Sequence, residues 1–106
     1  MAYWFLAAAI LAEVVGTVAL KFSDGFTRLG PSTVTVVGYL ISFALLAQTL
    51  KTVPVGTAYA IWSAAGTALI VAIGIVFLGE SATFARLGGI ALVIIGVVIL
   101  QIAEAH

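Results

Sequence analysis

Long apolar runs alternate with short polar breaks along this chain. The runs cover residues 3–21, 32–50, 55–78 and 84–103. A helix needs roughly 20 mainly apolar residues to cross about 30 Å of hydrocarbon. Lipid offers no hydrogen-bond partner to backbone groups, so each run must satisfy its own as a helix. The pattern predicts an all-α integral membrane protein with four transmembrane helices, arranged up-down-up-down as one domain over residues 1–106.

The breaks between the runs carry residues typical of turns. Asp24-Gly25 and Gly30-Pro31 follow the first run, and Gly79 ends the third. Glycine and proline punctuate regular structure most strongly. We therefore expect turns at these three points and short connections between the helices.

Composition agrees with a membrane protein and excludes several other classes. The chain is 64% apolar and 8% charged, whereas soluble domains are about 45–50% apolar and about 25% charged. A chain of 106 residues cannot bury so much apolar surface internally. The zero net charge and the absence of a basic run argue against nucleic acid.

Chemistry that needs a cofactor is not indicated either. The chain has no Cys, and its one His, His106, is the last residue, so we expect no metal site and no cofactor. No nucleophile–base pair points to an enzyme. No basic residue precedes the first apolar run, which argues against a cleaved signal peptide. No nucleotide-binding motif is present, so any transport must draw on a gradient.

Loop charges give only a weak orientation signal. Lys21, Arg28 and Arg86 lie in the first and third connections, and Lys51 lies in the second. Basic residues favour the cytoplasmic side, and so small a bias is compatible with insertion in both orientations.

A second copy of the chain is expected because four helices are few to enclose a polar pathway. Gly89 and Gly96 are seven residues apart in the fourth run and fall on one helix stripe. Small residues allow close helix packing in lipid, so this stripe is a candidate dimer seam. The alternative is that glycine is simply common in membrane helices.

Glu13 is the acid in the middle of the first run. It lies about ten residues from Tyr3, or roughly 15 Å at the helical rise. An ionisable side chain at that depth costs at least ~2.5–3.5 kcal/mol and marks a functional site by default. Burial and a second carboxylate nearby both favour its protonated form. We therefore predict that protons and cations compete for Glu13; a structural hydrogen bond is the alternative.

Polar and aromatic residues share helix faces that suit a cation pocket. Aromatic rings attract organic cations, although ordinary helix packing also places aromatics at such spacings. The candidates beside Glu13 on its own run are Gly16 and Thr17; those on the second and third runs are Tyr39, Ser42, Phe43, Tyr59, Trp62 and Ser63.

Three segments resemble the small multidrug resistance family of bacterial transporters. They are AEVVGTVALKFSDGFTRL at 12–29, SFALLAQTL at 42–50 and PVGTAYAIWSAAGTA at 54–68. The resemblance implies a dual-topology homodimer of antiparallel, oppositely inserted protomers in the bacterial inner membrane. It also implies proton-driven export of cationic hydrophobic small molecules by alternating access, with the lipid bilayer as surroundings.

The resemblance also assigns roles to residues. The family's essential glutamate falls on Glu13, and its dimer glycines fall on Gly89 and Gly96. Its substrate-lining aromatics and pocket hydroxyls fall on Tyr39, Tyr59, Trp62, Thr17 and Ser42. Many members have Gly-Val-Gly where this chain has Ala64-Ala65-Gly66, so Gly66 alone is left as a helix flexing point.

The family has two transporter subtypes, and the sequence resembles them to different degrees. Guanidinium exporters typically have Trp at the position of Gly16, and Gly16 leaves room for larger apolar cations. The segment KTVPVGTAY at 51–59 is closer to the guanidinium subtype. We predict export of quaternary ammonium and polyaromatic cations, with a guanidinium/proton exchanger as the alternative. A non-transporting membrane subunit, in which Glu13 pairs with a partner's basic residue, is a third hypothesis.

Overall fold

The computed structural model describes residues 2–104, which form four α-helices with short connections. The helices are α1 (Ala2–Phe22), α2 (Leu29–Thr49), α3 (Val55–Phe77) and α4 (Phe84–Glu104). All four are long and apolar enough to cross a membrane. This confirms the predicted all-α membrane fold. His106, the single histidine, lies outside the described residues.

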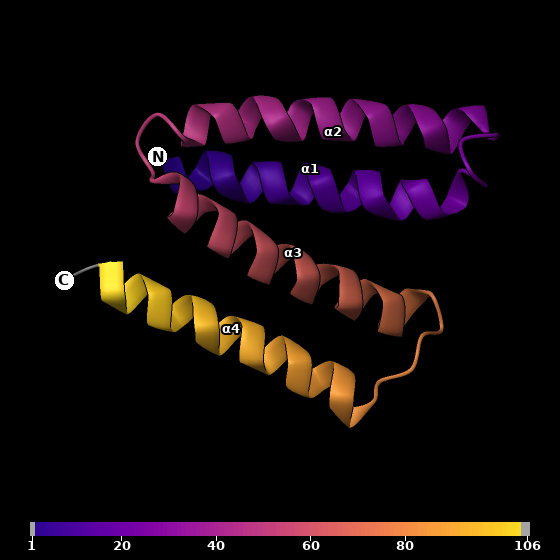
Figure 1. Cartoon of the computed structure of the whole chain (residues 1–106). Helices are drawn as coiled ribbons and strands as arrows, with labels where there is room; N and C mark the ends of the chain where they lie inside the picture. The colour runs from indigo at the N-terminus through magenta and orange to yellow at the C-terminus, as the bar shows by residue number, and fades with distance from the viewer. Residues whose placement is uncertain (1, 105–106) are drawn as a thin grey trace. The chain divides into compact units, whose positions relative to one another are not determined.

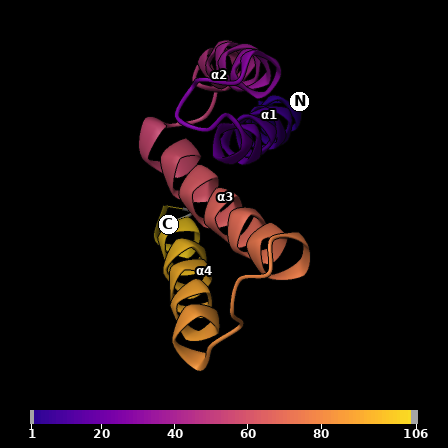
Figure 2. The ribbon, with the colours of Figure 1, turned by 90° about the vertical axis from the view of Figure 1, so that its right-hand side faces the viewer.

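The chain divides into two compact units, Met1–Pro54 and Val55–His106. The first contains α1 and α2, and Figures 1 and 2 show these helices lying side by side. The second contains α3 and α4, joined by the connection that precedes Phe84. The single four-helix domain expected from the sequence stays a prediction.

The start of α2 differs from the expectation. The helix begins at Leu29 rather than at position 32, so Gly30 and Pro31 lie in its first turn and form no turn of their own. Proline is tolerated there because the first N–H groups of a helix have no intrahelical acceptor. The turn at Asp24-Gly25 is confirmed, with left-handed φ values of 51° and 69°.

The backbones of α1 and α2 approach closely at Gly38. A Cβ atom added to Gly38 would lie 2.9 Å from the carbonyl oxygen of Ala12 and 3.3 Å from the Cα of Gly16. No side chain fits at position 38 without a shift of one helix. Small residues permit this kind of close helix contact in membranes, so Gly38 fixes where α1 and α2 meet.

The end of α3 folds back on Gly74. Gly79 has a φ of 71°, as expected for the break at this point. The N–H groups of Leu78 and Glu80 both donate to the carbonyl oxygen of Gly74, at 3.1 and 3.0 Å. The helix therefore ends in a compact turn that places the Glu80 side chain against Gly74.

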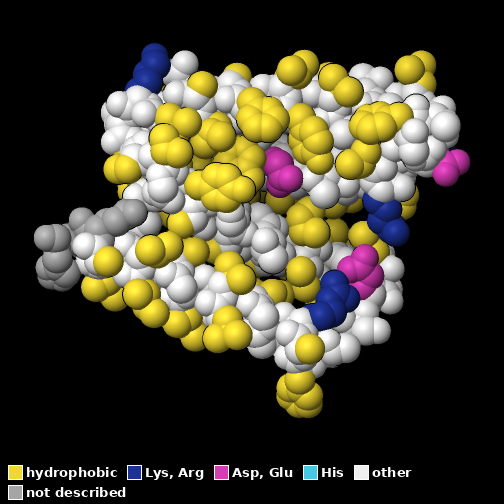
Figure 3. Space-filling model, viewed as in Figure 1, with side chains coloured by type: hydrophobic (Ala, Val, Ile, Leu, Met, Phe, Trp, Pro, Cys, Tyr) yellow, Lys and Arg dark blue, Asp and Glu magenta, His cyan; other side chains and the backbone are white. Residues whose placement is uncertain are grey.

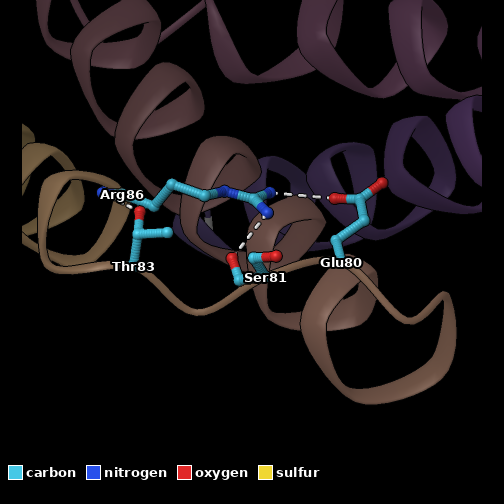
Figure 4. Close-up of polar contacts among 4 residues, drawn as sticks. All are labelled: Glu80, Ser81, Thr83 and Arg86. Carbon is cyan, nitrogen blue, oxygen red and sulfur yellow. Dashed lines mark hydrogen bonds and ion pairs between the residues drawn. The ribbon is translucent and has the colours of Figure 1, made fainter.

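Polar contacts also define the start of α4 (Figure 4). The hydroxyl of Thr83 accepts a hydrogen bond from the Arg86 N–H at 3.1 Å, which caps the helix. The Arg86 guanidinium donates to the Ser81 carbonyl oxygen and pairs with Glu80 Oε1, both at 2.8 Å. Arg86 thus links the end of α3 to the beginning of α4.

Candidate functional site

Glu13 lies in the middle of α1, where the surrounding sequence is apolar. Its side chain is half-buried. Figure 3 shows hydrophobic side chains over most of the face formed by α1 and α2, with an acidic side chain among them. A carboxyl group within a membrane-spanning helix needs hydrogen-bond partners, because lipid supplies none.

The partners of Glu13 form a chain of hydroxyl groups. Thr17 Oγ1 donates to Glu13 Oε1 at 2.8 Å, across one turn of α1. The same oxygen lies 2.7 Å from the hydroxyl oxygen of Tyr39 on α2. A threonine hydroxyl has one hydrogen, which is committed to Glu13. While Glu13 is a carboxylate, Tyr39 is therefore the donor to Thr17, and the chain of hydrogen bonds points toward the carboxylate.

The ring of Tyr39 occupies the space beside Gly16. A Cβ atom at position 16 would lie 2.9 Å from Cδ1 and from Cε1 of Tyr39. Gly16 is buried and Tyr39 is half-buried. The missing side chain of Gly16 is thus what lets the Tyr39 ring lie against α1 with its hydroxyl group beside Thr17.

A mainly apolar hollow lies on the opposite side of the contact between α1 and α2. It has a volume of about 520 Å³ and is lined by Leu11, Val15, Val37 and Ile41 among others. At 3.6 residues per turn, Leu11 and Val15 point away from Glu13 on α1. The hollow therefore lies on the side of α1 that faces away from Glu13.

The two other candidates on α2 differ in exposure. Ser42 is fully buried, and its Oγ atom has no hydrogen-bond partner among the described residues. Phe43 is 63% exposed. A direct contact of either residue with Glu13 stays a prediction.

Three candidates lie on α3, in the second unit. Tyr59, Trp62 and Ser63 share one face of the helix by their spacing, and Tyr59 is 72% exposed. Their roles as substrate contacts stay predictions from family resemblance. Gly66 is buried, and α3 runs without interruption through it, so its flexing also stays a prediction.

The glycines of the predicted dimer seam lie on an exposed part of α4. No described residue of α4 is buried, and a Cβ atom at Gly89 or Gly96 would meet nothing within 4 Å. The stripe is open in the single chain. Its use as a dimer seam stays a prediction.

Two residues at the α1–α2 contact were not among the candidates. Thr35 and Gly38 are both buried against α1. They precede Tyr39 and Ser42 at helical spacing on the same face of α2. That spacing was the feature of the sequence that could have identified them. Elsewhere in residues 2–104, no three His, Cys, Asp or Glu side chains gather into a possible metal site.

Comparison of the sequence with known proteins identifies the family of this chain. The family model described as "Small Multidrug Resistance protein" matches residues 1–103. The chain belongs to the small multidrug resistance family. It is accordingly a multi-pass protein of the bacterial inner membrane, and its family consists of transporters rather than enzymes.

Relatives of two kinds are similar over nearly the whole chain. The "Multidrug resistance protein mmr" of Mycolicibacterium paratuberculosis is 50% identical over 107 residues, covering 100% of both chains. The protein of the same name from Mycobacterium leprae is 47% identical, with the same coverage. The "Guanidinium exporter" of Escherichia coli is 46% identical over 103 residues, covering 97% of this chain and 98% of its own.

Proposed function

We propose that this small multidrug resistance transporter is a proton-coupled antiporter that exports quaternary ammonium and polyaromatic cations by alternating access. A proton and the cationic substrate compete for Glu13. The observation that carries the proposal is the hydrogen-bond chain from Tyr39 through Thr17 to Glu13, at 2.7 and 2.8 Å.

The competition follows from the charge of one carboxyl group. A carboxylate held by Thr17 attracts a cation, and the ring face of Tyr39 adds a cation–π surface beside it. A proton on Glu13 removes that attraction and frees the cation. Because either ligand excludes the other, inward flow of protons drives outward movement of cations when both sides open in turn.

The ring of Tyr39, rather than open space, supports apolar cations over guanidinium, because the ring fills the room that Gly16 leaves. Gly16 has no side chain, and Tyr39 lies in its place with a ring that can accept an apolar cation. Two relatives are named as multidrug resistance proteins. A guanidinium/proton exchanger is the second candidate, supported by the Escherichia coli relative named as a guanidinium exporter, which is almost as similar.

We further propose that the working unit is an antiparallel homodimer of oppositely inserted protomers. The open stripe at Gly89 and Gly96 supports this, because none of the described residues of this apolar helix is buried and the stripe is available for packing. The three-to-one distribution of basic residues over the connections is compatible with dual insertion.

The test is electrophysiology on a solid-supported membrane with the purified protein alone in liposomes. Tetraphenylphosphonium and tetramethylammonium should produce proton-coupled currents larger than those from guanidinium. Glu13→Gln should abolish them. Glu80→Gln is the matched control, because Glu80 lies outside the spanning segments and should leave the currents intact.

Two results would contradict the proposal in different ways. Currents retained in Glu13→Gln would show that protons and cations do not compete for Glu13. Robust currents with guanidinium, together with none from tetraphenylphosphonium, would assign the chain to the guanidinium subtype instead.

A further inference from the structure

Thr35 is a buried threonine on α2 that contacts the backbone of α1. It is 1% exposed. Its hydroxyl oxygen lies 3.0 Å from the carbonyl oxygen of Gly16 and also 3.0 Å from that of Pro31. A threonine hydroxyl has one hydrogen, so the two carbonyl oxygens share it: the contact with Pro31 is local to α2, whereas the contact with Gly16 joins the two helices.

The Gly16 segment of α1 is held from two consecutive turns of α2. Thr35 contacts its carbonyl oxygen, and the Thr35 carbonyl oxygen lies 3.2 Å from where a Cβ of Gly16 would be. Tyr39, one turn further along α2, places its ring against the same residue. A change in the distance between α1 and α2 at Thr35 must therefore also move the Tyr39 ring relative to α1.

We propose that Thr35 is a positioning residue for the hydrogen-bond chain that ends on Glu13. Its hydroxyl group sets the distance and register between α1 and α2, so that the Tyr39 hydroxyl lies 2.7 Å from Thr17. The effect on substrate binding rests on the proposed function; the effect on the Tyr39–Thr17 hydrogen bond does not.

The hydrogen-bonding capacity of the Thr35 hydroxyl group, rather than its volume, sets the distance between α1 and α2. The carbonyl oxygens of Gly16 and Pro31 are within helices, where they accept backbone N–H groups. Replacing Thr35 by Val therefore leaves no acceptor unpaired. It would instead place a methyl group 3.0 Å from the Gly16 oxygen, closer than the ~3.3–3.6 Å that carbon and oxygen adopt in contacts of this kind. The helices must move apart by a few tenths of an ångström.

Thr33 provides a matched control on the same helix. Its hydroxyl group donates to the Leu29 carbonyl oxygen at 2.8 Å, and its side chain is exposed. Thr33→Val therefore removes the same kind of local bond without removing a hydrogen bond to α1. Thr35→Ser is the conservative variant, because it keeps the hydroxyl group.

The experiment combines two readouts on the purified full-length protein. The ¹³Cζ resonance of labelled Tyr39 reports its hydrogen bond to Thr17, with Tyr39→Phe used to assign the signal. Binding of tetraphenylphosphonium reports the consequence for the site. Thermal midpoints for every variant separate a general loss of stability from a local effect.

We expect Thr35→Val to shift the Tyr39 resonance and to weaken tetraphenylphosphonium binding about three- to tenfold, the range that one neutral hydrogen bond supplies. Thr35→Ser and Thr33→Val should resemble the unmodified protein. Adding Thr35→Val to Tyr39→Phe should weaken binding no further, because both act through the same hydroxyl group.

An unshifted Tyr39 resonance in Thr35→Val would overturn the inference, and so would fully additive losses in the double variant. If Thr35→Val shifts the resonance while the unmodified protein binds no tetraphenylphosphonium, the positioning role stands and the proposed substrate class fails.

Discussion

The phenol ring of Tyr39 lies against Gly16, so that two of its carbon atoms are 2.9 Å from the position a Cβ atom would take. Any larger residue at position 16 must displace the ring. The ring carries the hydroxyl group that donates to Thr17. The identity of residue 16 therefore controls whether a residue of α2 can take part in the hydrogen bonds around Glu13.

Gly16→Ala should disturb the site through this contact. The added methyl group overpacks the helix contact, at a cost of about 1–3 kcal/mol, and the Tyr39 ring relieves it by moving. We expect roughly tenfold weaker binding of tetraphenylphosphonium, measured by isothermal titration calorimetry. Gly30→Ala is the control, because a Cβ atom there meets nothing within 4 Å. Equal affinities in the two variants would show that the ring is not held by Gly16.

Thr17→Val should weaken cation binding more strongly than Gly16→Ala. It removes the donor to Glu13 and the acceptor for Tyr39 together. A hydrogen bond to a charged group contributes about 1.5–3 kcal/mol, which corresponds to a loss of roughly ten- to a hundredfold.

The matching control is Thr17→Ser, which keeps the hydroxyl group and should retain most of the affinity. Quenching of tryptophan fluorescence by added substrate would follow both variants, in a Trp4→Phe background that leaves Trp62 as the single tryptophan. Similar losses in Thr17→Val and Thr17→Ser would mean that the methyl group matters rather than the hydrogen bonds.

The helices could be predicted because their lengths follow from a physical requirement. An apolar run must satisfy its backbone internally and span the hydrocarbon, so its ends are visible as polar residues. The start of α2 was misplaced because Pro31 is as acceptable in a first helical turn as in a loop. The bond from Thr17 to Glu13 also follows from local spacing, since residues four apart face each other on a helix.

The contacts between helices were harder to predict from the sequence. Gly38 is one of 11 glycines in the chain, and composition does not mark it as the one against which α1 packs. The pairing of Tyr39 with Thr17 depends on the register of α2 along α1, which Gly38 and Thr35 set through backbone contacts. A sequence pattern places residues on a face but does not fix how two faces slide past each other.

Gly96→Leu should impair dimer formation without disturbing the single chain. A Cβ atom at position 96 meets nothing within 4 Å in its own chain, so we expect the added side chain to clash chiefly with a second copy. Overpacking by about 1–3 kcal/mol predicts roughly a tenfold or greater loss in the association constant. Fluorescence resonance energy transfer between labelled protomers in liposomes would measure it.

Gly88→Leu is the control for this seam. Gly88 is equally open within the chain, but on the helix it lies about 100° from Gly89 and about 80° from Gly96. It should therefore leave association largely unchanged. If Gly88→Leu disrupts the dimer and Gly96→Leu does not, the seam lies on another face of α4.

Gly74→Ala should destabilise the turn between α3 and α4 through Glu80. A Cβ atom at position 74 would collide with the Glu80 carboxyl group, including its Cδ atom at 2.8 Å. Moving that group strains its pairing with Arg86 (Figure 4). An exposed ion pair of this kind contributes only about 0–1 kcal/mol, so Glu80→Ala alone should change the thermal midpoint little.

The decisive comparison is therefore the double variant. Gly74→Ala should lower the thermal midpoint by several degrees, the effect of about 1 kcal/mol or more in a small protein, and adding Glu80→Ala should restore it by removing the colliding carboxyl group. Gly56→Ala is the control on the same helix, because its Cβ atom would meet nothing within 4 Å. If Glu80→Ala deepens the loss caused by Gly74→Ala, the carboxyl group stabilises this turn in some way other than by packing on Gly74.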